Sequence, residues 1–262
     1  MVRHDRVVRH DDAVRIDDYV DVLRRDGEAL SRAAERAGPD AAVPTCPGWQ
    51  VRDLLAHLGG VHRWAAALVT TRRPDPFGAA DEKRFFDAPA DDALLGWFSD
   101  GHRDLVRTLT DADPALHCWT FFAAPSPLAF WARRQAHETA IHRADAEAAT
   151  ASAPDWEPGF AADGIDELLH GFLARRAARI TADPAVSLAL AADDVDAAWT
   201  VQLTPSGLLV DAGAHPPTLT LTGRASDLYR LLWNRSGSER LVVRGDLDAL
   251  ETWRHRVAIN WT

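Results

Sequence analysis

Hydrophobic side chains recur with the period of an α-helix through the first two thirds of the chain. In residues 16–37 the apolar positions fall three or four residues apart, and the stretch ends at the helix-stopping residues GPD. The same spacing predicts helices at residues 50–70, 91–111, 127–149 and 160–180. The segments between them contain proline and glycine, as is typical of loops.

The pattern changes near residue 184, where short runs rich in valine, leucine and threonine alternate with glycine, proline and aspartate. These runs predict β-strands, and their succession predicts a strand meander at residues 186–193, 197–204, 207–213 and 218–223. A helix at 225–235, a strand at 240–246 and a last helix at 247–258 are expected to follow.

Helices first and a sheet with helices afterwards are typical of an α+β protein with two unlike domains. The length of 262 residues is natural for two domains. We expect a helical domain at residues 16–183 and a small α/β domain at residues 184–262. A charged N-terminal arm at residues 1–15 is expected to precede them.

Composition and charge narrow the classes of function. The 47% hydrophobic content is that of a soluble globular protein, and the net charge of −10 argues against binding a nucleic-acid backbone. The two cysteines, Cys46 and Cys118, cannot form a disulfide framework. No apolar run approaches the roughly 20 residues of a spanning helix, and the first residues lack the apolar middle of a secretion signal. We therefore expect a cytoplasmic protein with neither a nucleic-acid nor a membrane partner.

The segment RRQAHETAIHRADAE, residues 133–147, concentrates histidine and carboxylate side chains in one predicted helix. His137 and His142 are five residues apart and diverge by about 140° around the axis, so they cannot easily share one ion. The HExxH motif of metalloproteases needs its histidines four apart, and Ile141 stands at that position. The segment is therefore not a metalloprotease motif.

Glu138 and His142 are four residues apart, within about 40° of each other on one helix face, and Asp145 extends the same stripe. A catalytic zinc usually takes three protein ligands, so a third would have to come from another helix. The alternative is a solvated pair on the polar side of an ordinary helix.

Five histidines are candidates for a third ligand. Apolar neighbours place His57 on the buried side of its helix, where it is either a ligand or a hydrogen-bonded core residue. Charged neighbours indicate that His62 and His102 are exposed. The remaining candidates are His117, which lies in a loop with Cys118, and His170.

Three segments resemble signatures of one known family. VPTCPGWQVRDLLAHLGGVHRW, HETAIHRADAE and ASDLYRLLWNR are similar, in order and approximate spacing, to motifs of the mycothiol-dependent maleylpyruvate isomerase family. The resemblance covers roughly residues 16–262. It implies a DinB-like four-helix bundle followed by a small α/β domain similar to sterol-carrier proteins.

The resemblance also implies a site. It assigns His57, Glu138 and His142 as ligands of a divalent metal, with Zn²⁺ the expected ion, and mycothiol as thiol cofactor or cosubstrate. It adds Asp145 as a site carboxylate and Arg235 as an arginine that reaches the site from the second domain, both expected to be catalytic. Arg143, immediately after a ligand, departs from the family pattern.

Our hypothesis is an isomerase or thiol S-transferase in which a metal-bound thiolate attacks a small electrophilic substrate. Asp145 would orient a ligand histidine or accept a proton, and Arg235 would clamp a substrate carboxylate. Trp49 is expected to pack at the end of the bundle, and His137 to be exposed or next to a ligand. We do not expect Cys46 to be the nucleophile. A metal-dependent hydrolase and a non-catalytic binder of an apolar ligand stay open as alternatives.

Overall fold

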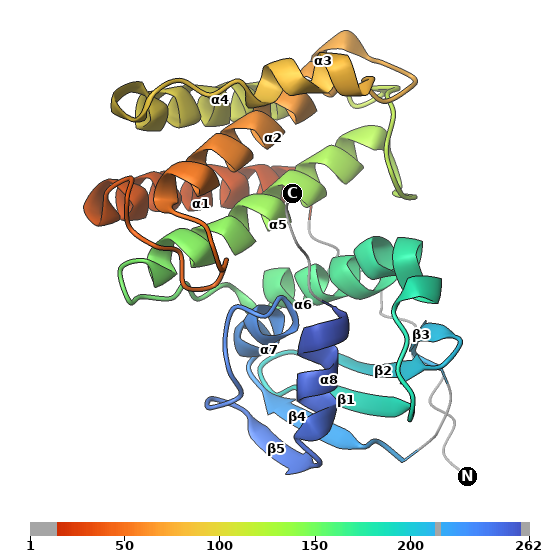
Figure 1. Cartoon of the computed structure of the whole chain (residues 1–262). Helices are drawn as coiled ribbons and strands as arrows, with labels where there is room; N and C mark the ends of the chain where they lie inside the picture. Colours follow the sequence, from red (N-terminus) through yellow and green to blue (C-terminus); the bar gives the residue numbers. More distant parts are fainter. Residues whose placement is uncertain (1–14, 213–215, 258–262) are drawn as a thin grey trace.

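Four long helices form a bundle in the N-terminal part of the chain (Figure 1). The computed structural model describes residues 15–212 and 216–257. Residues 1–14 of the predicted arm lie outside this range. The bundle helices agree with the predicted ones to within one residue at each end: α1 (Ile16–Ala37), α2 (Val51–Thr71), α4 (Asp91–Thr110) and α5 (Pro127–Ala148).

Helix α5 is the centre of the molecule. It packs against α1 and α2 on one side, and its side chains are buried around nearly its whole circumference. The helix begins where Ser126 accepts a hydrogen bond from the backbone N–H of Ala129 at 3.1 Å, with Pro127 in the first turn. Burial on every side explains why the hydrophobic pattern of this segment could not show which face carries the core.

The predicted helix at residues 160–180 changes its winding along its length. It begins as α6 (Pro158–Asp166), continues as a π-helical segment η3 (Glu167–Leu173) and ends as a 3₁₀ segment η4 (Ala174–Arg179). Helix α6 packs against α7 (Ala225–Leu232), which belongs to the C-terminal part. Helix α6 precedes the expected domain boundary at residues 183/184, and α7 follows it. The two expected domains are therefore in contact through these helices.

The connection between α2 and α4 carries two short helices, α3 (Ala79–Lys83) and η2 (Arg84–Phe86). Segment η2 packs against α2 and brings the ring of Phe86 over Gly60. A side chain at position 60 would overlap that ring, so the glycine that weakens α2 as a helix allows this close approach.

The C-terminal part is a five-stranded sheet with helices on one face (Figure 1). The strand order is β3-β2-β1-β4-β5. Buried leucines and valines alternate with threonine and alanine along the central strands, so one face of the sheet is apolar. The elements are β1 (Val186–Ala192), β2 (Ala198–Thr204), β3 (Gly207–Val210), β4 (Leu219–Gly223), α7, β5 (Val242–Gly245) and α8 (Asp248–Arg256).

The predicted meander is correct for the first three strands only. Strand β4 pairs in parallel with β1, on the side away from β2, and β5 then pairs with β4 in the antiparallel sense. A strand has the same alternation of apolar and polar residues whichever strand it pairs with. The sequence of β4 therefore could not indicate that it pairs with β1. The α+β class is confirmed, and no helix among the described residues is both long and apolar enough to cross a membrane.

The crossing of α1 and α4 gives a prediction about stability. Gly27 lies on α1 against the buried ring of His102, which is bonded through Nε2 to the carbonyl of Leu23 at 2.9 Å. A methyl group at position 27 would overlap that ring. We expect Gly27→Ala to lower the free energy of unfolding by about 1–3 kcal/mol through overpacking, measured by urea denaturation.

Gly96 is the matched control because it is an exposed glycine of α4 whose added Cβ would meet no atom within 4 Å. Gly96→Ala should raise the free energy of unfolding by about 0.5–1 kcal/mol through helix propensity. A stabilising Gly27→Ala would contradict the close packing of α1 on α4.

Candidate metal centre

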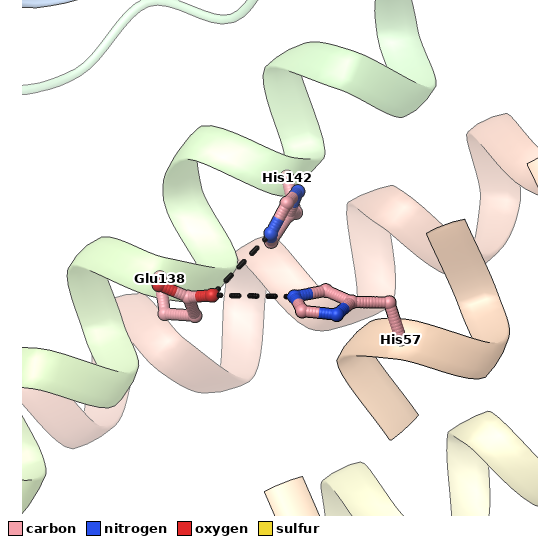
Figure 2. Close-up of side chains that lie close together, drawn as sticks. All are labelled: His57, Glu138 and His142. Carbon is pink, nitrogen blue, oxygen red and sulfur yellow. Dashed lines mark ion pairs between the residues drawn. The ribbon is translucent and has the colours of Figure 1, made fainter. Parts of the chain in front are cut away.

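Three side chains from two helices converge inside the bundle (Figure 2). His57 projects from α2, and Glu138 and His142 project from α5, so that one donor atom of each lies within 4.8 Å of the other two. Glu138 Oε1 is 3.3 Å from His142 Nε2 and 3.7 Å from His57 Nε2. The structure thus brings together the three residues that the family resemblance assigned as ligands.

The turn before α2 sets the position of His57. Gly48 has φ +89°, a conformation that favours glycine, and the backbone N–H of Val43 bonds to the carbonyl of Trp49 at 2.9 Å. Asp53 then accepts a hydrogen bond from the backbone N–H of Gln50 at 2.8 Å and caps the helix. The helix start is fixed in this way two turns before His57.

Trp49 contacts both histidines of the cluster. Its ring lies nearly parallel to that of His142, with centroids 6.4 Å apart, and is tilted against the ring of His57 at 5.3 Å. We expected Trp49 only to pack at the end of the bundle. Its ring also contacts two of the three side chains of the cluster. The position of Trp49, directly before the N-cap residue of α2, does not by itself indicate a contact with the histidines.

Glu138 is held in the charged state. Burial alone would raise the pKa of this carboxyl, but its hydrogen bonds with His142 and His57 and the charge of Arg134 hold the pKa well below its usual range. Arg134 donates from Nη2 to Glu138 Oε2 at 3.0 Å, so Oε1 is the oxygen turned toward the histidines. A buried carboxylate in this state is ready to bind a cation.

Asp145 lies behind His142. Its Oδ2 accepts a hydrogen bond from His142 Nδ1 at 2.9 Å, which leaves Nε2 facing the cluster, the arrangement by which a carboxylate orients a metal-binding histidine. Thr45 donates to the other oxygen, Oδ1, at 2.6 Å. Burial raises the pKa of Asp145, but the charge of Arg235 and the bond from His142 outweigh it and hold the pKa far below its usual range.

Arg235 reaches this carboxylate from the C-terminal part of the chain, just after α7. Its Nε and Nη2 donate to the two oxygens of Asp145 at 2.8 and 3.1 Å, and Nη1 donates to the carbonyl of Trp233 at 2.8 Å. The bidentate fork that we expected to hold a substrate carboxylate therefore holds Asp145. This geometry fits an arginine that positions Asp145, and through it His142.

The end of α7 places Arg235. Asn234 adopts φ 60°, the backbone N–H of Arg235 bonds to the carbonyl of Arg230 at 2.8 Å, and that of Asn234 bonds to the carbonyl of Leu231 at 2.9 Å. This pair of bonds is the Schellman motif that ends many helices. The chain turns sharply at Asn234, and the turn directs the Arg235 side chain at the bundle.

Three histidines lie where we did not expect them. His62 and His102 are buried, not exposed, because their charged neighbours in sequence lie on other faces of α2 and α4. His62 Nε2 lies 2.9 Å from the hydroxyl of Thr139, and burial holds the pKa of both histidines below its usual value. His137 is also buried and lies 2.8 Å from Asp163.

His137 belongs to a separate group of contacts that joins α5 to α6 and α7. Its Nδ1 lies 3.1 Å from the Tyr229 hydroxyl of α7, and its ring stacks on Phe160 of α6. Of the other candidates, His117 is exposed, and His170 pairs with Asp211 at 2.9 Å. In the part of the chain that the structure describes, only His57, Glu138 and His142 form a group able to hold a metal ion.

The buried Cys46 is poorly suited to nucleophilic attack. Burial and the neighbouring charge of Asp145 raise the pKa of its thiol to about 12, so the thiol stays protonated near neutral pH. Its Sγ lies 3.5 Å from Arg235 Nη2, which indicates a packing contact beside the site.

The donor set fits a divalent cation of the zinc type. Two imidazole nitrogens and one carboxylate oxygen are common zinc ligands, and three protein ligands leave a coordination position for a small molecule. The short distances between the donors fit a shared ion, and the bond from Asp145 fixes His142 in the tautomer that such an ion requires.

Comparisons with known proteins identify the family of this chain and agree with its fold. Residues 20–147 match the sequence model of the mycothiol maleylpyruvate isomerase N-terminal domain, and residues 159–252 match that of the MDMPI C-terminal domain. Crystal structures of the mycothiol-dependent maleylpyruvate isomerase and of a histidine-to-alanine mutant of it each align with a TM-score of 0.64 and 13% identity. Each alignment covers 87% of this chain and 92% of the other. No curated protein matches significantly.

The cluster predicts which substitutions abolish cation binding. We expect Glu138→Gln to weaken Zn²⁺ binding at least about 100-fold, because the amide replaces the only anionic donor. Competition with a chromophoric chelator measures this affinity. His137→Gln is the matched control, since this buried neighbour faces Asp163, and it should change the affinity less than about threefold. Equal losses in the two variants would contradict the assignment of ligands.

Proposed function

The chain belongs to the mycothiol maleylpyruvate isomerase family, and from this premise we propose that it is a metal-dependent enzyme that uses mycothiol to isomerise a small electrophilic substrate. The convergence of His57, Glu138 and His142 carries this proposal, because it offers a divalent cation three ligands and an open position. A bound divalent cation favours the thiolate form of a thiol near neutral pH, and Zn²⁺ is the ion that suits these donors best.

The residues of the chain have distinct tasks in this proposal. His57, Glu138 and His142 hold the cation. Asp145 keeps the Nδ1 proton of His142 in place, and Arg235 keeps Asp145 ionised and oriented. Asp145 and Arg235 are thus positioning residues, which revises the expectation that Arg235 binds a substrate carboxylate.

The thiol supplies the nucleophile, which agrees with the protonated state of Cys46. Its sulfur forms a C–S bond to one carbon of an activated cis C=C, and the electron pair of that double bond moves into the conjugated carbonyl. Rotation about the resulting single bond follows. The electron pair then returns, the C–S bond breaks, and the thiolate leaves with the trans isomer formed and no net proton consumed. In a transferase, the C–S bond would persist.

A turnover assay tests the proposal. Zn²⁺-loaded protein, maleylpyruvate and mycothiol are mixed, and conversion to the trans isomer is followed by absorbance. We expect turnover only when both the cation and the thiol are present, and a loss of at least about 100-fold in Glu138→Gln. Cys46→Ala should keep at least about a third of the activity.

Two results would contradict the proposal. Turnover without mycothiol would indicate a hydrolase-like reaction, in which water takes the place of the thiol. Loss of activity in Cys46→Ala, with Zn²⁺ and mycothiol still bound, would make the protein thiol the nucleophile.

A further inference from the structure

Arg134 ties the carboxylate of the cation centre to a second buried acid. Its Nη2 donates to Glu138 Oε2 at 3.0 Å, and its Nη1 donates to a carboxylate oxygen of Glu167. The three side chains are only 3%, 6% and 1% exposed, respectively. Arg134 therefore binds the oxygen of Glu138 that is turned away from the two histidines, and Glu167 binds the far side of Arg134.

The surroundings of Arg134 make its charge effective. The rings of Phe172 and Trp233 lie 5.4 and 6.0 Å from its guanidinium carbon. Glu167 and Phe172 both come from the π-helical segment η3, and Trp233 comes from the end of α7. Because the three charged side chains are buried and aromatic rings flank the guanidinium, charges here interact more strongly than they would at the surface.

Stability of the fold alone does not explain the buried ion pairs of Glu138, Arg134 and Glu167. Buried ion pairs are often no more stabilising than apolar residues of similar size, because desolvation offsets their attraction. Glu167 Oε1 is buried and has no hydrogen-bond partner among the described residues. An unsatisfied carboxylate oxygen adds a further cost. The charges of Arg134 and Glu167 therefore call for a functional explanation.

A count of charges supplies one. With neutral imidazoles, the buried groups around the centre comprise three carboxylates, Glu138, Asp145 and Glu167, and two guanidinium groups, Arg134 and Arg235. They leave one net negative charge, and a divalent cation changes this to one net positive charge. One anionic ligand, such as a thiolate, makes the buried site neutral.

We propose that Arg134 and Glu167 are opposed charge-setting residues of the cation centre. Arg134 keeps the loaded site positive enough to favour an anionic ligand, and Glu167 limits that charge so that the divalent cation itself still binds. The inference rests on the proposed function, because the anionic ligand in question is the thiolate.

Charge-changing variants of the two residues test this inference with Co²⁺ as a spectroscopic probe. The affinity for Co²⁺ is measured at pH 8 by chelator competition, and thiocyanate binding to the Co²⁺-loaded protein is measured by visible absorption. Arg134→Gln should bind Co²⁺ roughly tenfold more tightly and thiocyanate roughly tenfold more weakly, because a nearby positive charge is lost. Glu167→Gln should bind Co²⁺ roughly tenfold more weakly and thiocyanate roughly tenfold more tightly, because a nearby negative charge is lost.

Two further variants separate charge from packing. Arg134→Lys keeps the charge but not the fork, and it should leave thiocyanate binding within about threefold of the wild type. Arg133→Gln is the matched control, because Arg133 is the preceding residue of α5 but pairs with Asp163. We expect it to change neither affinity by more than about twofold. Circular dichroism checks that each variant folds.

The outcomes distinguish the inference from its premise. Opposite shifts in Arg134→Gln and Glu167→Gln support it, since a purely structural role would weaken binding in both variants. Parallel losses would overturn it while leaving the cation centre intact. Failure of the wild-type protein to bind Co²⁺ would overturn the proposed function, and the inference with it.

Discussion

The approach of His57 on α2 to Glu138 on α5 is the contact on which the rest of the site depends. Two helices that are about 80 residues apart in sequence place an imidazole nitrogen 3.7 Å from a carboxylate oxygen, and His142 completes the group from the same helix as Glu138. Without that approach, Glu138 and His142 would be only an i, i+4 pair on a buried helix. With it, the bundle contains a candidate cation centre, in which Arg134 binds Glu138 and Asp145 orients His142.

The part of the chain that follows the four bundle helices contributes to this centre without supplying a ligand. Arg235 reaches Asp145 from the end of α7, and Glu167 reaches Arg134 from η3. Each arginine binds one carboxylate of α5, and that carboxylate either faces the cluster or orients a histidine that does. Side-chain contacts connect α5 to the segments that carry these residues: His137 contacts Tyr229 of α7 and Phe160 of α6. Charged side chains of the bundle and of the segments after it therefore act together on one buried site.

The sequence predicted the bundle helices, the strands and the α+β class, because each element has a clear apolar period or a clear stop signal. Spacing alone identified the pair Glu138 and His142, but it left five histidines open for the third position, and only the family resemblance selected His57. The burial of His62 and His102 was missed, because charged neighbours in sequence say nothing about the face on which a helical side chain lies. His137 was expected to be exposed or next to a ligand, and it instead contacts Asp163. Arg134 gave no signal either, since its partner Glu167 lies on a helix whose winding changes where the two residues meet.

X-ray absorption spectroscopy at the zinc edge can show whether these three side chains hold the ion and whether the thiol binds to it. For the Zn²⁺-loaded protein, we expect only nitrogen and oxygen atoms bound to the metal, with the outer-shell scattering of two imidazoles. Addition of mycothiol should bring one sulfur to about 2.3 Å from the metal. A spectrum with fewer than two imidazoles, or one in which saturating mycothiol adds no sulfur, would contradict the assembly of this site and its use of a thiol.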